Sequence, residues 1–546
     1  MTVTMDAIDA VIAYHEATKH HPGRFARSPG QLDWASQPEP FRRFETAPLH
    51  PLPLVSGDPT PPYDALFSGG IPTHPLTRDT LGALFEHALG LSAWKAYRGE
   101  RWALRCNPSS GNLHPTEGYA VLPPVSGIHD GPAVYHYAPR EHALERRADL
   151  TPDAWNALAA PLPENAFLVG LTSIHWREAW KYGERAFRYC QHDLGHAFAA
   201  LAVSATALGW SMRRLVTPAD AEIAELLGLA RADDFPPGEL EHPGLLAAVL
   251  PGAPTTSTLD IPSEAFTRAA ACVWHGHAEP LSASHVPWTA IEDIARAAAK
   301  PRTTPQSPHL PSPQASAAHT APISARTIIR RRRSAVAMDG HTACPRDAFY
   351  RSLARLMPDR AGPIWNAFAT VPQVNLIFFV HRVEGLAPGI YGLVRNAGHE
   401  PRLRGAMRPD FAWRKPGGCP GNLPFYLLVP GDCRQLAGQL CCGQAIASDG
   451  AFATAMLAAF DHPLQHAGPW AYRVLFQETG MLGQLLYLEA ETAGLRGTGI
   501  GCFFDDLVHE VLGLRDRQFQ SLYHFTIGGP VDDPRLSTLP PYPHRK

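Results

Sequence analysis

The sequence lacks the features that mark several large classes of protein. No apolar run reaches the roughly 18–20 residues of a membrane span, and no basic segment followed by an apolar one stands at the start, so we expect no signal peptide. Charged residues make up only 18% of the 546 residues, and 48 Lys plus Arg nearly balance 51 Asp plus Glu. This balance gives no reason to expect nucleic acid or an anionic membrane as a partner.

Cysteine is also scarce. The nine cysteines are spread along the chain without a Cys-x-x-Cys pair, which favours a reducing cytoplasm over a disulfide scaffold. We expect Cys190 to be a core residue, and the adjacent Cys441 and Cys442 to be buried apolar positions rather than a redox pair. The histidine pairs at 20–21 and 275–277 have no third ligand at suitable spacing, so no metal site is expected.

Proline, by contrast, is abundant, with 54 residues, about twice the usual ~5% share. Residues 300–322, KPRTTPQSPHLPSPQASAAHTAP, show no hydrophobic periodicity and are dominated by Pro, Ser, Thr and Ala. This composition predicts an extended or disordered linker. It divides the chain into an N-terminal domain, 1–299, and a C-terminal domain, 323–546, each long enough for its own core.

The two domains look like copies of one another. An offset of 285 residues aligns 186–229 with 471–514 without a gap, and 11 of the 44 aligned positions are identical. Helical periodicity covers 185–208 and 472–493, and each segment ends at a glycine suited to a helix C-cap. Hairpins are predicted from 133–137 and 389–393, and further strands at 118–122, 166–171, 374–382, 424–429 and 522–527. We predict a duplication that gives two α+β domains packed face to face.

Two segments carry residue types that suit ligand binding. The turn Pro108-Ser-Ser-Gly-Asn112 could hydrogen-bond a planar heteroaromatic ring through its hydroxyl and amide groups, or could simply begin a helix. The four arginines before Ser334 could bind a phosphate, because guanidinium groups match phosphate oxygens, or could form a solvated basic stretch. Composition alone leaves both alternatives open.

Two more segments suggest a site. The glycines of Gly497-Thr-Gly-Ile-Gly501 would let the backbone approach a ligand closely, but the strand-then-helix context of a dinucleotide fingerprint is missing. Just before the first long helix, 180–185 reads WKYGER, where a lysine and a tyrosine could transfer protons or lie on the surface. The second copy has QHA at 465–467 instead, so only one copy would hold this site.

Longer stretches around these segments resemble a known family. The likeness to the nitroreductase superfamily of FMN-dependent oxidoreductases is carried by YHEATKHHP at 14–22, PSSGNLHPTEGYAV at 108–121, WKYGERAFRYCQHDLGH at 180–196, RRRS at 331–334, AYRVLFQETGMLGQLLYLEAETAGLRGTGIGCFFDD at 471–506 and FTIGGPVDDPR at 525–535. More narrowly, the chain is similar to the SagB/ThcOx-type dehydrogenases, which oxidise thiazolines and oxazolines to azoles in peptide natural products.

The resemblance implies FMN at an interface between two such units, here the two halves of one chain. It assigns cofactor binding to Arg331, Arg332, Arg333, Ser334, Gly499, Ile500, Gly501 and Arg535 in the C-terminal half and to Pro108, Ser109, Ser110 and Asn112 in the N-terminal half. It assigns catalysis to Lys181 and Tyr182. The N-terminal half has Met212-Arg-Arg-Leu215 where the glycines would be, which implies one FMN per chain. Val336 stands where a further basic residue is common, so phosphate binding would depend on Arg331 or Arg535.

We therefore expect two tandem nitroreductase-like domains that form an internal pseudo-dimer and act as an FMN-dependent two-electron oxidoreductase in the cytoplasm. The main hypothesis is oxidation of an azoline-like small molecule or peptide. The alternatives are an NAD(P)H-dependent nitro or quinone reductase and a non-catalytic binding protein with a decayed flavin site. Whether the chain is a monomer or pairs further is left open.

Overall fold

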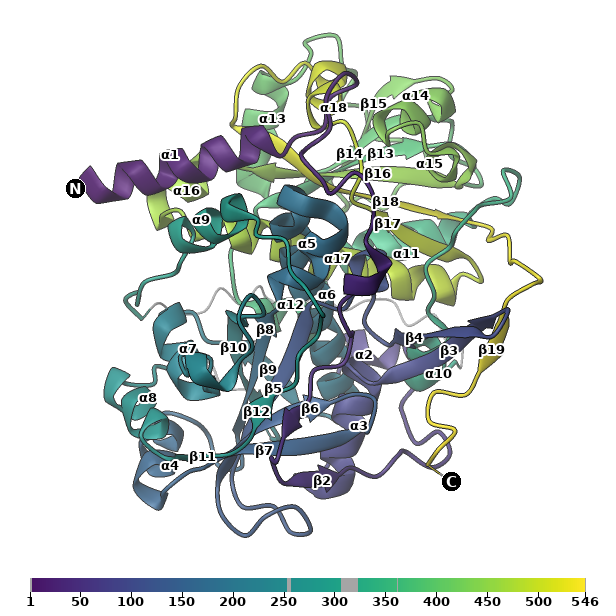
Figure 1. The fold of residues 1–546 in the computed structure, drawn as a ribbon. Helices are drawn as coiled ribbons and strands as arrows, with labels where there is room; N and C mark the ends of the chain where they lie inside the picture. Colours follow the sequence, from purple (N-terminus) through teal and green to yellow (C-terminus); the bar gives the residue numbers. More distant parts are fainter. Residues whose placement is uncertain (1, 253–256, 306–322, 361, 546) are drawn as a thin grey trace.

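Two long helices lie side by side at the centre of the molecule (Figure 1). The structure, a computed structural model, describes residues 2–252, 257–305, 323–360 and 362–545. Helices α6 (Ala186–Ala207) and α17 (Ala471–Thr492) each have 22 residues and are buried along nearly their whole length. Their bounds agree to within one residue with the helices that the periodicity predicts.

Glycine sets how closely these helices approach. A Cβ atom on Gly195 of α6 would lie 2.0 Å from the carbonyl oxygen of Gln477, and one on Gly480 of α17 would lie 2.0 Å from that of His192. No side chain fits at such distances, so the backbones are in contact where the helices cross. Gly195 and Gly480 are themselves related by the offset of 285 residues, so the crossing marks a local pseudo-twofold axis.

Each half contributes an antiparallel sheet with the same strand order. The N-terminal sheet runs β7 (Ala143–Asp149), β6 (Ala133–Ala138), β5 (Thr116–Leu122), β8 (Phe167–Ser173), β10 (His242–Leu250), β9 (Ser211–Arg214), with β11 (Val273–Trp274) and β2 (Leu49–Pro51) added beside β7. The C-terminal sheet runs β15 (Phe425–Pro430), β14 (Gly389–Leu393), β13 (Val374–Val380), β16 (Phe452–Ala459), β18 (Phe519–Gly528), β17 (Arg496–Ile500). The strand order thus matches position by position.

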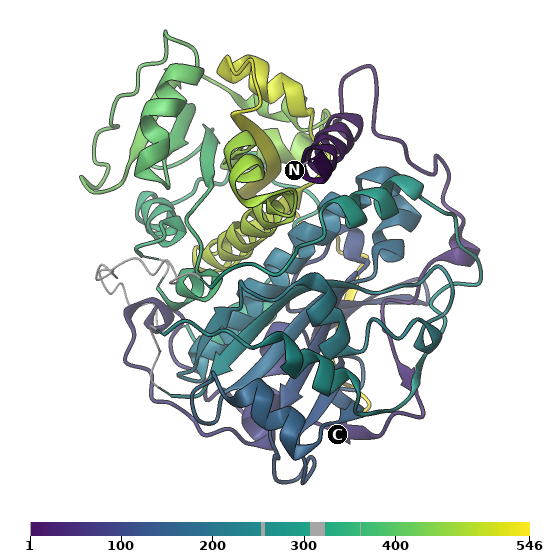
Figure 2. The ribbon, with the colours of Figure 1, turned by 90° about the vertical axis from the view of Figure 1, so that its left-hand side faces the viewer.

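Successive side chains of each strand point to opposite faces of its sheet, and each face packs against its own core. In β5, Ala120 and Leu122 face the central helices, whereas Tyr119 and Val121 face an outer core. This outer core lies under α4 (Pro152–Ala159), α7 (Asp220–Leu227) and α8 (Ser263–Ala270). In β13, Leu376 and Phe378 face the centre, and Ile377 and Phe379 face an outer core. Both sheets are therefore covered on both faces, and Figure 2 shows the central helices between them.

The connections in the two halves also correspond. Helices α7 (Asp220–Leu227) and α18 (Asp505–Leu512) follow the strands β9 and β17, and each ends at a glycine with a left-handed backbone, Gly228 and Gly513. The structure is α+β, and its two halves share one strand order and corresponding helices. Their origin in a duplication stays a prediction.

The remaining elements complete the halves. They are α1 (Thr2–Ala17), α2 (Ala65–Ser68), α3 (Arg78–Ala88), α4 (Pro152–Ala159), α5 (His175–Tyr182), α8 (Ser263–Ala270), α9 (Thr289–Ala297), α10 (Ala325–Arg331), α11 (Arg346–Leu356), α12 (Pro363–Phe368), α13 (Glu400–Ala406), α14 (Arg434–Leu440), α15 (Ala445–Asp449), α16 (Asp461–Ala467), β1 (Phe44–Glu45) and β12 (His277–Ala278). Within the described part of the chain, no helix is both long and apolar enough to cross a membrane.

Segments at both ends of the chain cross from one half to the other. Helix α1 leads to Lys19, whose Nζ lies 2.9 Å from a carboxylate oxygen of Asp506 in the C-terminal half. In the opposite direction, β19 (Ser537–Leu539) pairs with β3 (Leu91–Tyr97), which continues to β4 (Glu100–Arg105). Beyond β19, the Tyr542 hydroxyl accepts a hydrogen bond from the Leu91 amide and donates one to the Pro139 carbonyl. The halves are therefore interlocked.

Some sequence expectations need correction. The strand 389–393 was expected to enter a short hairpin, but its antiparallel partner β15 follows only after residues 394–424, which include α13. The expected linker begins with a packed segment, because the Lys300 amide donates to Asp220 and the Thr303 amide donates to the Thr217 carbonyl. Its residues 306–322 lie outside the described residues. Strands β3, β4, β10 and β16 were not predicted.

Candidate functional site

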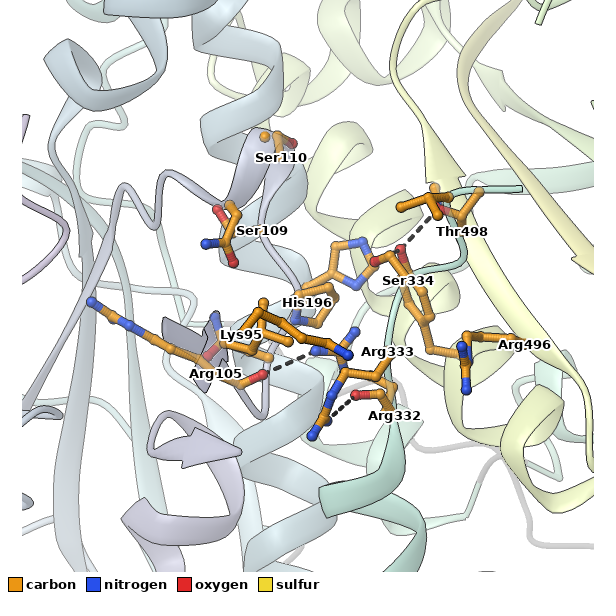
Figure 3. Close-up of a pocket in the computed structure, with 18 of the residues that line it drawn as sticks. Lys95, Arg105, Ser109, Ser110, His196, Arg332, Arg333, Ser334, Arg496 and Thr498 are labelled. Carbon is orange, nitrogen blue, oxygen red and sulfur yellow. Dashed lines mark hydrogen bonds between the residues drawn. The ribbon is translucent and has the colours of Figure 1, made fainter. Parts of the chain in front are cut away.

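A cavity of about 1000 Å³ lies between the halves. This is the upper end of the roughly 300–1,000 Å³ typical of small-molecule and cofactor sites. The N-terminal half contributes β3, β4, the turn after β4 and the facing sides of α5 and α6. The C-terminal half contributes the end of α10, β17 and the segment after β18. Figure 3 shows Ser109 and Ser110 on one side of the pocket and the basic side chains on the other, with His196 between them.

The Pro-Ser-Ser turn is held by a buried carboxylate. Ser109 Oγ donates to Asp193 Oδ2 at 2.5 Å, and both Ser110 Oγ and the Ser110 amide donate to Asp193 Oδ1, at 3.0 and 3.1 Å. Ser109 stands before a single 3₁₀ turn, 110–112, and its side chain does not cap that turn. The backbone φ of Asn112 is +61°, an uncommon conformation for a residue other than glycine. The turn is therefore fixed by Asp193 on α6 rather than by a helix cap.

Asp193 is a functional candidate that the sequence analysis did not single out. Burial raises the pKa of its carboxyl to about 7, while the hydrogen bonds from Ser109 and Ser110 act in the opposite direction. The buried Glu178 carboxyl lies nearby on α5, and both of its oxygens lack a hydrogen-bond partner among the described residues. Burial, with the adjacent Asp193 charge, raises the pKa of Glu178 well above its usual range. Burial thus raises the pKa of two neighbouring carboxyl groups, of which Asp193 lines the cavity.

Replacing Asp193 by Asn should remove part of the pH dependence of stability. Because the folded-state pKa is raised, folding favours the protonated carboxyl, and stability falls as pH rises from about 4 to about 7. A shift of this size corresponds to on the order of 4 kcal/mol at about 1.36 kcal/mol per pKa unit. Urea unfolding of both proteins at several pH values between these limits measures the effect. At each pH, the difference in the free energy of unfolding between wild type and variant gives the contribution of Asp193 apart from the other titrating groups. If this free energy depended on pH in the same way in both proteins, the raised pKa of Asp193 would be contradicted.

The arginine run divides into residues with different surroundings. Arg332 is buried, and its Nε and Nη2 each donate at 2.9 Å to the carbonyl oxygens of Cys106 and Arg105. Arg333 donates through Nη1 to the carbonyls of Arg330 and Arg332 and to Ser92. Arg331 lines the cavity and is exposed. The run is therefore not a solvated stretch, and Arg332 joins the two halves.

Ser334 and the glycine strand meet at one tyrosine. The Tyr487 hydroxyl, from α17, lies 2.8 Å from Ser334 Oγ and accepts the Gly499 amide at 2.9 Å. A Cβ on Gly499 would lie 1.9 Å from the Tyr523 hydroxyl, and one on Gly501 would lie 2.4 Å from the Tyr189 ring. Any side chain at positions 499 and 501 would clash with these tyrosines, so both positions require glycine. Gly499, Ile500 and Gly501 line the cavity.

The two expected catalytic residues differ in position. Tyr182 lines the cavity, and its hydroxyl lies so close to the Ser turn that a Cβ on Gly111 would come within 2.6 Å of it. Burial raises the pKa of Tyr182 well above its usual value. Lys181 is half-buried, does not line the cavity and holds its Nζ 5.3 Å from the centre of the Tyr182 ring.

The other expected residues fall into two groups. The cavity wall includes Pro108, Ser109, Ser110, Asn112, Arg331, Arg332, Arg333, Ser334, Gly499, Ile500 and Gly501. Arg535 is not part of the wall: it is exposed and pairs with Asp533 at 2.7 Å. The wall also includes residues that sequence reasoning missed, namely Lys95, Trp102, Tyr189, Asp193, His196, Tyr487, Arg496 and Tyr523. Lys95 and Arg496 add positive charge to the cavity wall, where Arg496 pairs with Asp532 at 2.7 Å.

The internal alignment relates the large cavity to a second place in the molecule, which is nearly closed. The offset of 285 residues relates Gly499 and Ile500 to Arg214 and Leu215, which line a cavity of about 30 Å³, close to the volume of one water molecule. The Lys300 ammonium lies there, 5.3 Å from the centre of the Trp470 ring. The Arg214 guanidinium lies 4.5 Å from the Phe368 ring centre. At this second place, side chains fill the space that is open in the large cavity.

Parts of this chain are similar to known proteins. Residues 428–529 match the Nitroreductase family model. This match covers part of the C-terminal half. A relative from Methanocaldococcus jannaschii, named "Putative nitroreductase MJ1384", is 29% identical over 157 residues, which cover 28% of this chain and 75% of that protein.

The solved structures show that the fold extends through both halves. A crystal structure from Anabaena variabilis, described as that of a "putative nitroreductase", matches 96% of this chain and 99% of its own with a TM-score of 0.70 and 21% identity. At this identity the match shows the fold alone. The Escherichia coli microcin synthetase complex McbBCD matches 34% of this chain and 69% of its own at 20% identity, but its TM-score of 0.26 is too low to support an inference.

Proposed function

We propose that this chain is an FMN-dependent two-electron oxidoreductase with one site built by both halves. The observation that carries the proposal is the cavity itself, which gathers the Pro-Ser-Ser turn, the arginine–serine segment and the glycine strand from distant parts of the sequence. The nitroreductase-family match over 428–529 supports the same class of chemistry.

The donor set of the cavity suits FMN. Arg331, Arg333, Lys95 and Arg496 line the same cavity as Ser334 and supply the positive charge that suits a phosphate. Ser109, Ser110 and Asn112 on one side and the Gly499–Gly501 backbone on the other would hold the ring. The cavity wall also includes His196, whose Nε2 lies 3.1 Å from the Tyr523 hydroxyl.

The protein supplies proton transfer and orientation. FMN, when bound, accepts or donates a hydride equivalent. Asp193, with a pKa of about 7, suits a general base at neutral pH, as the removal of a carbon-bound proton requires. It lies within hydrogen-bond distance of both serine hydroxyls of the turn. Tyr182, whose hydroxyl lies beside the same serine turn, would orient the substrate or relay the proton.

Within this class we propose a dehydrogenase that oxidises an azoline-like ring in a small molecule or peptide. The sequence resemblance supports this substrate. A nitro or quinone reductase driven by NAD(P)H is the second candidate, favoured by Tyr182: its raised pKa keeps the phenol protonated at neutral pH and suits it to donate a proton rather than to accept one.

Parallel anaerobic titrations distinguish the two candidates. The flavin-loaded protein is mixed with NADH, NADPH or a thiazoline-containing peptide, and the flavin absorbance is followed. Bleaching by the peptide, together with an azole product in its mass spectrum, supports the dehydrogenase. Bleaching by a nicotinamide alone, reversed by a quinone or nitroaromatic, supports the reductase. Failure of all donors with flavin bound would contradict both assignments.

We expect one FMN per chain. The large cavity can accept the cofactor, whereas its pseudo-equivalent of about 30 Å³ cannot. Acid extraction of the flavin and its quantification against protein concentration should give a ratio near one. A ratio near two would mean that Lys300 and Trp470 move aside to open the second place. No bound flavin, even after incubation with excess FMN, would contradict the proposed function itself.

A further inference from the structure

We propose that Cys442 and Cys502 form a redox-active dithiol at the wall of the cavity, which closes reversibly to a disulfide. Cys502 follows Gly501 directly and lines the cavity, and Cys442 comes two residues after α14. Both are partly accessible. The expectation that Cys441 and Cys442 are both buried is wrong for Cys442, whereas Cys441 is 1% exposed.

Hydrogen bonds fasten the two cysteine-bearing segments to each other. The Gln444 side-chain amide donates to the carbonyl oxygens of Cys441 and Cys502, at 2.8 and 2.9 Å. The Phe504 amide donates to the Leu440 carbonyl at 2.8 Å. Each of the thiols of Cys442 and Cys502 is a main influence on the pKa of the other, and both are free. The two segments are therefore held side by side, with a free thiol on each.

The backbone of Cys442 supports a special role. Its φ is +56°, in the left-handed region that costs energy for a residue with a Cβ and that clusters at functional sites. Glycine would adopt this conformation freely, and Gly443 beside it does so with φ of +75°. A cysteine held in this conformation is consistent with a position fixed for its thiol.

The two thiols are chemically unequal. Hydrogen bonds from Cys442 and His20, with the nearby Arg185 charge, favour the Cys502 thiolate and lower its pKa. The same contact raises the pKa of Cys442. Because the thiolate is the nucleophile in thiol–disulfide exchange, Cys502 is the attacking sulfur and Cys442 the resolving one.

The reaction balances with a low-molecular-weight disulfide as oxidant. The Cys502 thiolate attacks one sulfur of the disulfide, which forms a mixed disulfide and releases the first small thiolate. Cys442 then loses its proton, attacks the Cys502 sulfur and releases the second small thiolate. Two protein thiols are oxidised by two electrons, and one small disulfide is reduced to two thiols. Dithiothreitol reverses the reaction. No step requires the flavin, so the inference is independent of the proposed function.

Thiol trapping on the full-length protein tests the proposal. The protein is equilibrated with mixtures of reduced and oxidised glutathione, quenched with acid, alkylated with N-ethylmaleimide and analysed by intact and peptide mass spectrometry. We expect a single two-electron transition, a mass lower by two hydrogen atoms before alkylation, and a linked peptide pair that contains residues 442 and 502. Absence of that pair across all mixtures would overturn the proposal.

Two single variants and one control sharpen the test. In Cys442→Ser, glutathione should stay trapped on Cys502, because the resolving thiol is missing. In Cys502→Ser, the linked peptide pair that contains residues 442 and 502 should be absent, because the attacking thiol is missing. Cys272→Ser, which replaces another partly accessible cysteine far from the cavity, should behave as wild type. A Cys442→Ser protein without the trapped adduct, or with one that forms no faster than on Cys272, would contradict the assigned roles.

Discussion

Replacing Tyr182 by Phe should leave the bound-flavin spectrum unchanged and lower turnover by about 10²–10⁴-fold, the usual contribution of a positioned acid or base. The hydroxyl reaches the serine turn inside the cavity, whereas the ring packs against Tyr189 with centroids 4.7 Å apart. The substitution removes the hydroxyl and keeps the ring, so the pocket retains its shape. Stopped-flow measurement of flavin reduction and reoxidation would show which half-reaction slows.

Lys181→Ala is the matched comparison. Its ammonium lies above the Tyr182 ring and outside the cavity wall, so we expect a smaller loss of turnover than for Tyr182→Phe. Wild-type turnover of the Tyr182→Phe variant would rule out a proton-transfer role for this hydroxyl. Loss of flavin from the variant would instead identify Tyr182 as a structural residue of the pocket.

Changing both Arg331 and Arg333 to alanine should weaken flavin binding by about a hundredfold or more, because each charge-assisted contact to a phosphate contributes roughly 1.5–3 kcal/mol. Both guanidinium groups belong to the cavity wall. Fluorescence titration of the apoprotein with FMN gives the dissociation constant. Titration with riboflavin, which lacks the phosphate, should show little difference between wild type and variant.

Two further variants test whether this effect is specific. Arg346→Ala removes an exposed arginine outside the cavity wall and should bind FMN as wild type does. Arg332→Ala should lower the free energy of unfolding as well as FMN affinity, because its guanidinium bonds to two carbonyls of the N-terminal half. Unchanged FMN affinity in the double variant would show that Arg331 and Arg333 do not hold the phosphate.

Sequence periodicity was sufficient where a signal is repeated along a segment. The long helices were predicted to within one residue because their apolar positions recur over many turns. Strand β16 escaped detection because its sequence, FATAMLAA, is rich in alanine, which is depleted in strands. The sheet of β19 with β3 and β4 joins residues far apart in the sequence, and no local pattern indicates such a pairing.

The candidate site was predictable as a set of segments but not as a geometry. Motif resemblance found the serine turn, the arginine run and the glycine strand. It could not distinguish Arg331, which is exposed, from Arg332, which is buried, because neighbouring residues of one type carry the same signal. Asp193 and Tyr487 lie in the middle of helices, and only the packing of α6 and α17 reveals that they hold the serine turn and the glycine strand.

The cavity takes its walls from two halves of one chain, and this has a consequence for dilution. A site shared between separate subunits is lost when their concentration falls below the dissociation constant of the dimer. Here covalent linkage makes the meeting of the two walls an intramolecular event, governed by an effective concentration that does not change with the amount of protein. The affinity for a ligand in this cavity should therefore be the same at nanomolar as at micromolar protein.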